Sequence, residues 1–548
     1  MGGELKTKSL SPVLCLFVVI ASLIVRVNAQ NQAPASSAAL PQLKQVAYIK
    51  ASNAEAADHF ACGGALDGHT GNSVAISADG NTMAIGAHQE SSSAKVINGA
   101  QNNNNAYASG AVYVFTRTAA SWAQQAYIKA SNARQGANFG AVVVLSADGN
   151  TMAVSSHFES SASKGVNNNQ NDESIPQAGA VYVFSRTGTT WTQQAYLKAS
   201  NTGRSPVPGN PEDWGDGDQF GFSVAISGDG NTVAVGAISE DSTASSVNNF
   251  QFQDDDSANS SGAVYVFARA GTTWSQQAYV KSANSRGGQL FGYGVSLSLD
   301  GNTMAVSGYD EAGSGRTPNA IPDQRRAGSG AIYVFTRSDS NWRQSAYLKG
   351  SRSEGGDSVG VSLAISQDGN TIAAGSADED CYMPGVNPPG CDNERVDNTS
   401  SGAAYVWVRN GNNWSEQAFI KSSNPGLEDW FGVRVALSGD GNTLAISAPL
   451  EDSMGQGINP KQDDELANDA GAVYFFTRDG TTWTQKASVK AAHNEIYDEF
   501  GSALALSRDG RTLVVGARGE DSAAKGVNGN QRDNSASEAG AAFVFSYN

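Results

Sequence analysis

The chain has 548 residues, of which 40% are hydrophobic and 16% are charged, and its formal net charge at pH 7 is −17. A chain this acidic is a poor partner for nucleic acid and for anionic membrane surfaces, because binding to either normally uses a basic patch. We therefore expect no nucleic-acid partner.

Residues 1–29 have the pattern of a signal peptide. Lys6 and Lys8 precede an apolar run at 13–25, and small residues follow at the expected cleavage site. The run is shorter than the roughly 20 apolar residues that a membrane span needs, although a retained signal anchor is the alternative. No other stretch is as apolar, so we expect a secreted, extracellular protein with no membrane span once the leader is removed.

A repeated unit fills residues 42–548, after a short linker at 30–41 that is rich in Ala, Ser and Pro. Its clearest copy, between 220 and 281, contains four short runs rich in Val, Ile, Tyr, Phe and Trp, each closed by Gly, Asn or Asp, which predict four strands. An Asp-Gly turn marks each copy, at Asp79, Asp148, Asp229, Asp300, Asp368, Asp440 and Asp509. Seven such copies predict an all-β fold, a seven-bladed β-propeller of four-stranded blades. A linear β-solenoid is the alternative.

The two ends of the repeat region indicate how the ring closes. The last copy stops at Asn548 after its third strand, and the missing fourth strand is present at 43–50, which aligns with 122–129. We expect this N-terminal strand to complete the last blade and to bury Val46, Tyr48 and Ile49. Closure of this kind removes the open sheet edges that promote aggregation.

The repeats resemble the FG-GAP, or integrin α-subunit-like, β-propeller repeat. The Phe-Gly pairs that carry the resemblance start at Phe139, Phe220, Phe291, Phe431 and Phe500, and degenerate Gly-Ala-Pro pieces start at Gly86, Gly236, Ser447 and Gly516. The resemblance implies a seven-bladed ring with a role in cell adhesion or extracellular ligand binding. This chain lacks the Asp-x-Asp-x-Asp-Gly calcium loop of such repeats. Its Ser-x-Asp-Gly-Asn-Thr segment predicts a plain hairpin turn, because one carboxylate cannot supply the roughly 6–8 oxygen ligands that calcium takes.

The long loops on one face of the predicted propeller are the expected place for ligand binding. They open and close with acidic residues that are candidate calcium ligands, namely Glu240, Asp241, Asp254, Asp255, Asp256, Glu451, Asp452, Asp463 and Asp464. Carboxylate oxygens are suitable calcium ligands. The alternative is that these loops are acidic because they are solvated.

Amide-rich tracts and two tryptophans on the same loops suggest a second kind of ligand. The candidates for a glycan-binding face are Asn102, Asn103, Asn168, Asn169, Trp214 and Trp430. Amides suit sugar hydroxyls and an aromatic ring suits the apolar face of a sugar, so a lectin is possible, with polar low-complexity loops as the alternative. Sequons at Asn259, Asn398 and Asn413 predict N-glycosylation in a eukaryotic host.

Three cysteines lie beyond the predicted signal peptide, and the sequence has no evident catalytic motif. Cys381 and Cys391 bracket a short loop and are predicted to form a disulfide in an oxidising compartment, and Cys62 is either buried or available for an intermolecular bond. No zinc-ligand spacing, nucleophile elbow or phosphate loop is evident. We therefore expect an adhesion or recognition module that binds an extracellular protein or glycan. A glycosidase or lyase is the less favoured alternative.

Overall fold

The computed structural model describes residues 43–63, 71–119, 121–203, 217–391 and 399–547. The leader and the linker expected at 1–29 and 30–41 lie outside these residues. The described chain folds into seven four-stranded antiparallel sheets and one three-residue 3-10 helix, Phe250–Phe252. No helix in these ranges has the length and hydrophobicity to cross a membrane.

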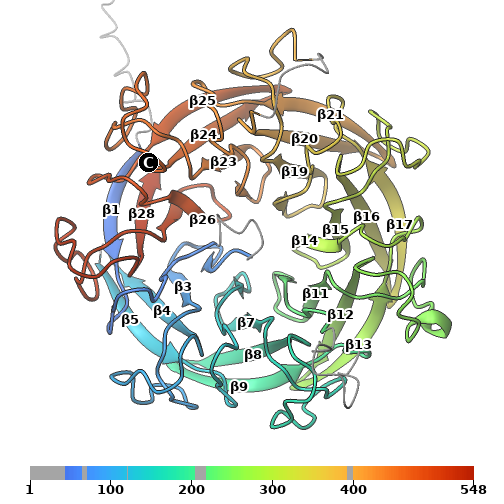
Figure 1. Cartoon of the computed structure of the whole chain (residues 1–548), viewed down its shortest axis with the longest axis horizontal. Helices are drawn as coiled ribbons and strands as arrows, with labels where there is room; N and C mark the ends of the chain where they lie inside the picture. The colour runs from blue at the N-terminus through green and yellow to red at the C-terminus, as the bar shows by residue number, and fades with distance from the viewer. Residues whose placement is uncertain (1–42, 64–70, 120, 204–216, 392–398, 548) are drawn as a thin grey trace, which may run out of the picture. The chain divides into compact units, whose positions relative to one another are not determined.

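Each sheet is one blade, and in six of the seven blades the strands follow the chain from the centre of the ring outward (Figure 1). The innermost strands are β2 (Val74–Ile76), β6 (Val143–Leu145), β10 (Ser223–Ile226), β14 (Phe291–Leu297), β18 (Leu363–Ile365), β22 (Val435–Leu437) and β26 (Phe500–Leu506). The second strands are β3 (Thr82–Ala87), β7 (Thr151–Ser156), β11 (Thr232–Ala237), β15 (Thr303–Gly308), β19 (Thr371–Ser376), β23 (Thr443–Ala448) and β27 (Thr512–Ala517).

The outer half of each blade is built from two longer strands. The third strands are β4 (Ala111–Thr118), β8 (Ala180–Thr187), β12 (Ala263–Ala270), β16 (Ala331–Ser338), β20 (Ala403–Asn410), β24 (Ala472–Asp479) and β28 (Ala541–Tyr547). The outermost strands are β5 (Ser121–Ile128), β9 (Thr190–Leu197), β13 (Thr273–Val280), β17 (Asn341–Leu348), β21 (Asn413–Ile420), β25 (Thr482–Val489) and β1 (Leu43–Ile49). We number the blades 1 to 7 by their innermost strands, from β2 to β26.

The N-terminal strand closes the ring as expected. β1 pairs with β28 in blade 7, with Ile49 opposite Ala542, and innermost strand β26 lies against β2 of blade 1. The expected burial of Tyr48 and Ile49 is confirmed, but that of Val46 is wrong, because Val46 is 37% exposed. The register shifts between Gln45 and Ala47, so Val46 occupies a bulge and its side chain does not follow the alternation of a regular strand.

Neighbouring blades pack through a repeated tryptophan. The Trp191 indole nitrogen donates to Gln125 Oε1 of the preceding blade at 3.1 Å, and the Arg186 guanidinium lies 5.3 Å from the Trp191 ring centre. The same residue type recurs, nearly fully buried, as Trp122, Trp274, Trp342, Trp414 and Trp483. These tryptophans therefore hold blades together and are not exposed ligand platforms.

Candidate functional site

The two faces of the ring differ in how their strands are joined. On one face the first two strands of each blade meet in the Asp-Gly turn. There, Gly230 has φ +68°, Ser227 Oγ donates to Asp229 Oδ1 at 2.6 Å and the Asn231 backbone NH donates to the same oxygen at 2.9 Å. The turn carboxylate is thus used internally, which agrees with the hairpin predicted from the sequence.

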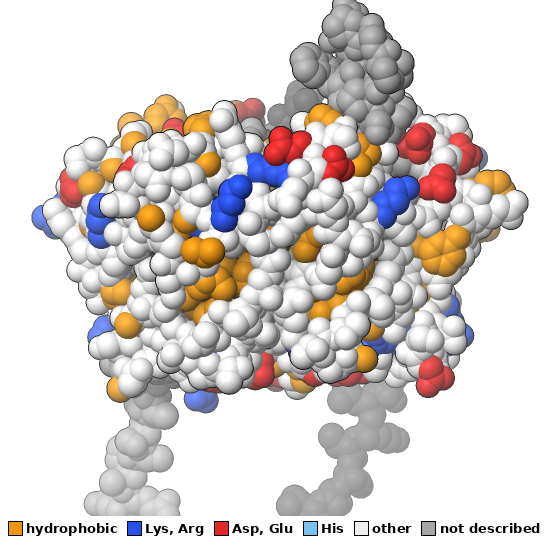
Figure 2. All heavy atoms as spheres, turned by 90° about the horizontal axis from the view of Figure 1, so that it is seen from below, with side chains coloured by type: hydrophobic (Ala, Val, Ile, Leu, Met, Phe, Trp, Pro, Cys, Tyr) orange, Lys and Arg blue, Asp and Glu red, His pale blue; other side chains and the backbone are white. Residues whose placement is uncertain are grey.

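The opposite face, which we call the long-loop face, carries two kinds of long connection. Second-to-third loops join those strands within a blade, and inter-blade loops lead from an outermost strand to the next innermost one; Figure 1 shows them spread around the ring. In the side view of Figure 2, acidic side chains are more frequent near the upper edge than near the lower edge.

Each second-to-third loop also protects the outer edge of its blade. In blade 2, the Asn167 NH donates to the Tyr196 carbonyl at 2.8 Å, and the Tyr196 NH donates to Asn167 Oδ1 at 2.8 Å. Equivalent asparagines are Asn98, Asn248, Asn319, Asn387, Asn459 and Asn528. The loops therefore occupy part of the backbone that would otherwise remain unpaired on an edge strand.

A buried lysine–glutamate ion pair lies beneath the long-loop face in every blade. In blade 3, Lys281 Nζ is 2.5 Å from Glu240 Oε2, and Glu240 Oε1 accepts hydrogen bonds from the Tyr279 hydroxyl at 2.6 Å and from Asn201 Nδ2 at 3.0 Å. The other pairs are Lys129–Glu90, Lys198–Glu159, Lys349–Glu311, Lys421–Glu379, Lys490–Glu451 and Lys50–Glu520. In blades 1 to 5 and in blade 7, burial lowers the pKa of the lysine, and the partner carboxylate opposes that shift.

Two of the expected calcium ligands belong to these ion pairs, and the others lie elsewhere in the long loops. Glu240 and Glu451 are buried and face lysines, while Asp241 and Asp452 accept backbone NH groups of their own loops. The remaining candidates are exposed or half-buried: Asp254, Asp255, Asp256, Asp463 and Asp464. Among the described residues, no three of these carboxylates lie close enough to share an ion, so calcium stays a prediction.

The expected glycan-binding residues belong to separate loops. Asn102 and Asn103 lie in the loop of blade 1, Asn168 and Asn169 in that of blade 2, and half-buried Trp430 in the connection from blade 5 to blade 6. Asn103 is also engaged locally, since its Oδ1 accepts from the Ser93 NH at 3.1 Å. Trp214 lies outside the described residues.

The structure contains the expected disulfide and describes two of the three sequon asparagines. Cys381 and Cys391 form the expected disulfide, with their Cα atoms 5.4 Å apart. Asn259 and Asn413 are exposed, as glycosylation requires, and Asn398 lies outside the described residues. Glycosylation stays a prediction.

A second buried carboxyl accompanies the ion pair in several blades. Asp429 accepts the Gly426 NH at 2.6 Å, and burial, together with the nearby Glu451 charge, raises the pKa of Asp429 to about 8. Asp357 and Asp498 occupy the same place, and burial raises the pKa of each to about 8. One lysine cannot balance two ionised carboxylates in a poorly solvated site, so the aspartate is protonated at neutral pH.

We expect Asp429→Asn to weaken the pH dependence of stability. The native aspartate has a pKa of about 8, against roughly 3.9 unfolded. The folded state therefore binds the extra proton between about pH 4 and 8, and its contribution declines with rising pH by up to about 1.4 kcal/mol per unit. The loss of melting temperature between pH 5 and 8 should be smaller in the variant. Asp254→Asn, at an exposed position of blade 3, is the control, and parallel profiles for all three proteins would refute the assignment.

A cleft opens on the long-loop face where blades 6, 7 and 1 meet. Its volume is about 610 Å³. The lining residues are His59, Asp469, Glu495, Ile496, Tyr497, Glu499, Arg518, Gly519, Asp521, Asn534, Ser537 and Glu538. Ile496 and Tyr497 are more than half exposed at its rim. The cleft thus combines exposed apolar side chains with several carboxylates and one arginine.

The charges inside this cleft are partly desolvated. Arg518 lies 2.6 Å from Glu499 Oε1, whereas Glu499 Oε2 is buried without a hydrogen-bond partner in the described part of the chain. Burial raises the pKa of Glu499 and also that of Asp469. A ligand with a hydrogen-bond donor would find a ready acceptor in Glu499.

The structure also contains a cluster of two histidines and one cysteine that the sequence analysis does not predict. His59, Cys62 and His88 come together at the boundary of blades 7 and 1, and burial lowers the pKa of His88 to about 3. Cys62 is buried, as one of the two sequence interpretations held. The signal for this contact was present, because Phe60-Ala61-Cys62 occupies the place of a Phe-Gly-x segment, but Ala61 concealed the alignment.

Comparison with known protein families supports the repeat. A model of the family described as FG-GAP repeat matches residues 210–267, 414–476 and 483–545. No curated protein matches this chain in sequence.

Similar solved structures include a chain of the mitotic checkpoint complex, at 11% identity and a TM-score of 0.42, covering 90% of this chain and 95% of that one. The periplasmic gluconolactonase PpgL of Pseudomonas aeruginosa has 13% identity, a TM-score of 0.41 and coverage of 77% and 86%. Hydrazine synthase of Kuenenia stuttgartiensis has 11% identity, a TM-score of 0.42 and coverage of 82% and 92%. At these identities and scores the three structures carry no argument about activity. The FG-GAP repeats matched in three places and the ring of seven four-stranded blades together fit an FG-GAP β-propeller.

Proposed function

We propose that this protein is a secreted or cell-surface recognition module that binds an extracellular protein through the cleft at blades 6, 7 and 1. One observation carries the proposal. All the large hydrophobic side chains that are exposed in the described chain lie in the long loops, apart from Val46. They are Val96, Tyr107, Phe250, Phe252, Ile321, Tyr382, Met383, Leu427, Met454, Leu466, Ile496 and Tyr497. Exposed apolar groups with a polar surround are typical of protein-binding surfaces.

The cleft is the preferred part of this surface. Ile496 and Tyr497 are adjacent in sequence, 57% and 56% exposed, and border a concave site that also offers Arg518 and several carboxylates. Tyrosine and arginine are frequent among the residues that dominate binding energy at interfaces. The glycan alternative has weaker support, because its candidate amides and Trp430 lie in separate loops.

We expect the double variant Ile496→Ser/Tyr497→Ser to lose at least tenfold in affinity for the protein ligand, since an apolar anchor contributes about 2 kcal/mol or more. The full chain and its variants would be tested against a panel of extracellular proteins and a glycan array. Ile321→Ser, at an 88% exposed position in blade 4, is the matched control and should bind normally. Binding to glycans alone, with competition by free sugar, would establish the lectin instead. Turnover of a polysaccharide would establish the enzyme.

A further inference from the structure

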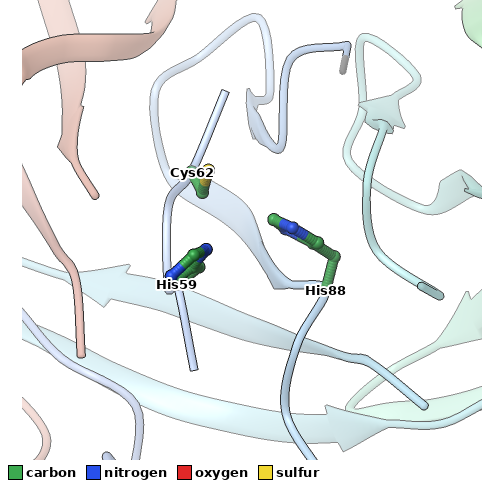
Figure 3. Close-up of side chains that lie close together, drawn as sticks. All are labelled: His59, Cys62 and His88. Atoms are coloured by element: carbon green, nitrogen blue, oxygen red, sulfur yellow. The ribbon is translucent and has the colours of Figure 1, made fainter. Parts of the chain in front are cut away.

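Three side chains with metal-binding chemistry converge beside the closure of the ring. His59 and Cys62 lie in the connection from β1 to β2, and His88 directly follows β3. One potential ligand atom from each lies within 4.8 Å of the others, and no other group of three such residues meets this condition in the described ranges. Figure 3 shows the two imidazole rings and the thiol facing a common space.

The repeat explains why these positions meet. His59 precedes Phe60 with a φ of +51°, and the Phe60 NH donates to the Ala539 carbonyl at 3.1 Å, as the Phe139 NH does to that of Ser109 in the next blade. Cys62 follows two residues after this phenylalanine, and His88 takes the place of proline in Gly-Ala-Pro. In blade 2 the corresponding residues are Asn138, Ala141 and His157. Blade 1 alone has a metal-binding side chain at all three positions.

Two further observations indicate that the cluster of His59, Cys62 and His88 is suited to bind a ligand. His88 is 5% exposed, and its Nδ1 is buried without a hydrogen-bond partner in the described chain, an arrangement that is unfavourable for a polar atom unless a ligand supplies the missing contact. On His59, Nε2 lies 2.9 Å from Glu538 Oε2. A carboxylate at one ring nitrogen is the usual outer contact of a metal-binding histidine, where it fixes the tautomer and the ring orientation.

We propose that His59, Cys62 and His88 bind a transition metal ion of the zinc class through two imidazole nitrogens and one thiolate. Thiolate and imidazole ligands favour zinc or copper over calcium and magnesium, which take oxygen ligands. Three protein ligands leave a fourth position for water or another ligand. Bond lengths of about 2.0–2.3 Å separate tetrahedral ligand atoms by about 3.3–3.6 Å, so small side-chain rotations close the site.

The charged groups around the site are balanced. Arg518 interacts with the Cys62 sulfur, and Arg434 is also close enough to be influenced by it. Glu499 lies 2.6 Å from Arg518 and Glu538 contacts His59, so two carboxylates offset positive charge around the site.

The test uses the full chain, treated with a chelator and then titrated with Co²⁺ or Zn²⁺. We expect one ion per chain and, with Co²⁺, the intense near-ultraviolet charge-transfer band of a cobalt–thiolate bond. Cys62→Ala and His59→Asn introduce residues that blade 2 already has at these positions, so they should fold. Cys62→Ala should abolish the band and lower affinity at least 100-fold, and His59→Asn should lower affinity at least tenfold.

His157→Asn is the matched control, because His157 occupies the place of His88 in a blade that lacks the other two ligands. It should bind cobalt like the unmodified protein. Zinc should raise the melting temperature of both but not that of Cys62→Ala, and should protect the Cys62 thiol from alkylation. Equal cobalt binding by Cys62→Ala and the unmodified protein, or no specific binding at all, would overturn the proposal.

Discussion

Removing residues 43–50 should eliminate the soluble monomer. This segment contains β1 and Lys50, and it buries Leu43, Tyr48 and Ile49 against blade 7. At about 1.5–3 kcal/mol for each large apolar side chain, its burial contributes on the order of 5–9 kcal/mol. That is comparable with the net stability of a whole domain, about 5–15 kcal/mol. The deletion also exposes the edge of β28 and leaves Glu520 without Lys50.

The measurement is the fraction of soluble, monomeric protein by size-exclusion chromatography, together with the melting temperature. Val46→Gln is the control within the same strand. Four other blades have glutamine at the position of Val46. In one of them Gln125 accepts from the Trp191 indole of the next blade, whereas the equivalent Trp122 indole has no partner in the described chain. This variant should keep or raise the melting temperature. A deletion variant that stays monomeric with unchanged melting would contradict closure by β1.

Replacing Glu240 by alanine should destabilise the protein by about 3–5 kcal/mol, the usual cost of leaving one member of a buried ion pair alone. Lys281 would lose its counter-charge in a fully buried site, and the Tyr279 hydroxyl and Asn201 amide would lose an acceptor. The midpoint of denaturant unfolding measures the effect. Asp254→Ala, in the same loop but with a side chain that is 82% exposed, should change the midpoint little.

A double variant separates charge from packing. Glu240→Leu/Lys281→Met removes both charges and should recover much of the stability lost in Glu240→Ala, because apolar replacements of buried ion pairs are often neutral or stabilising. If Glu240→Ala and Asp254→Ala unfolded at the same denaturant concentration, the ion pair would have no structural role.

The architecture was predictable because it depends on local patterns. The Asp-Gly turns, the alternating strands and the transfer of the missing strand to 43–50 each follow from a few neighbouring residues. The error at Val46 arose from a bulge, which shifts side-chain direction by one residue and leaves no mark in a strand pattern.

The site was less predictable because it depends on contacts between distant residues. Charged residues are expected at the surface, so the sequence predicts a solvated or calcium-binding loop around Glu240. Its actual partner is the lysine that directly follows the outermost strand in every copy. His59 and His88 are separated by two strands, β2 and β3, and their contact depends on the packing of Phe60 in the ring.

The pairing of Ile49 with Ala542 has a consequence for biosynthesis. At about 5–20 residues per second, the ribosome needs roughly 25–100 s to produce the partner strand after the first one has emerged. During that interval the earliest strand has no sheet to join, while the intermediate blades fold beside it. The first strand therefore stays unpaired until β28 has been synthesised, and the ring closes only after that point.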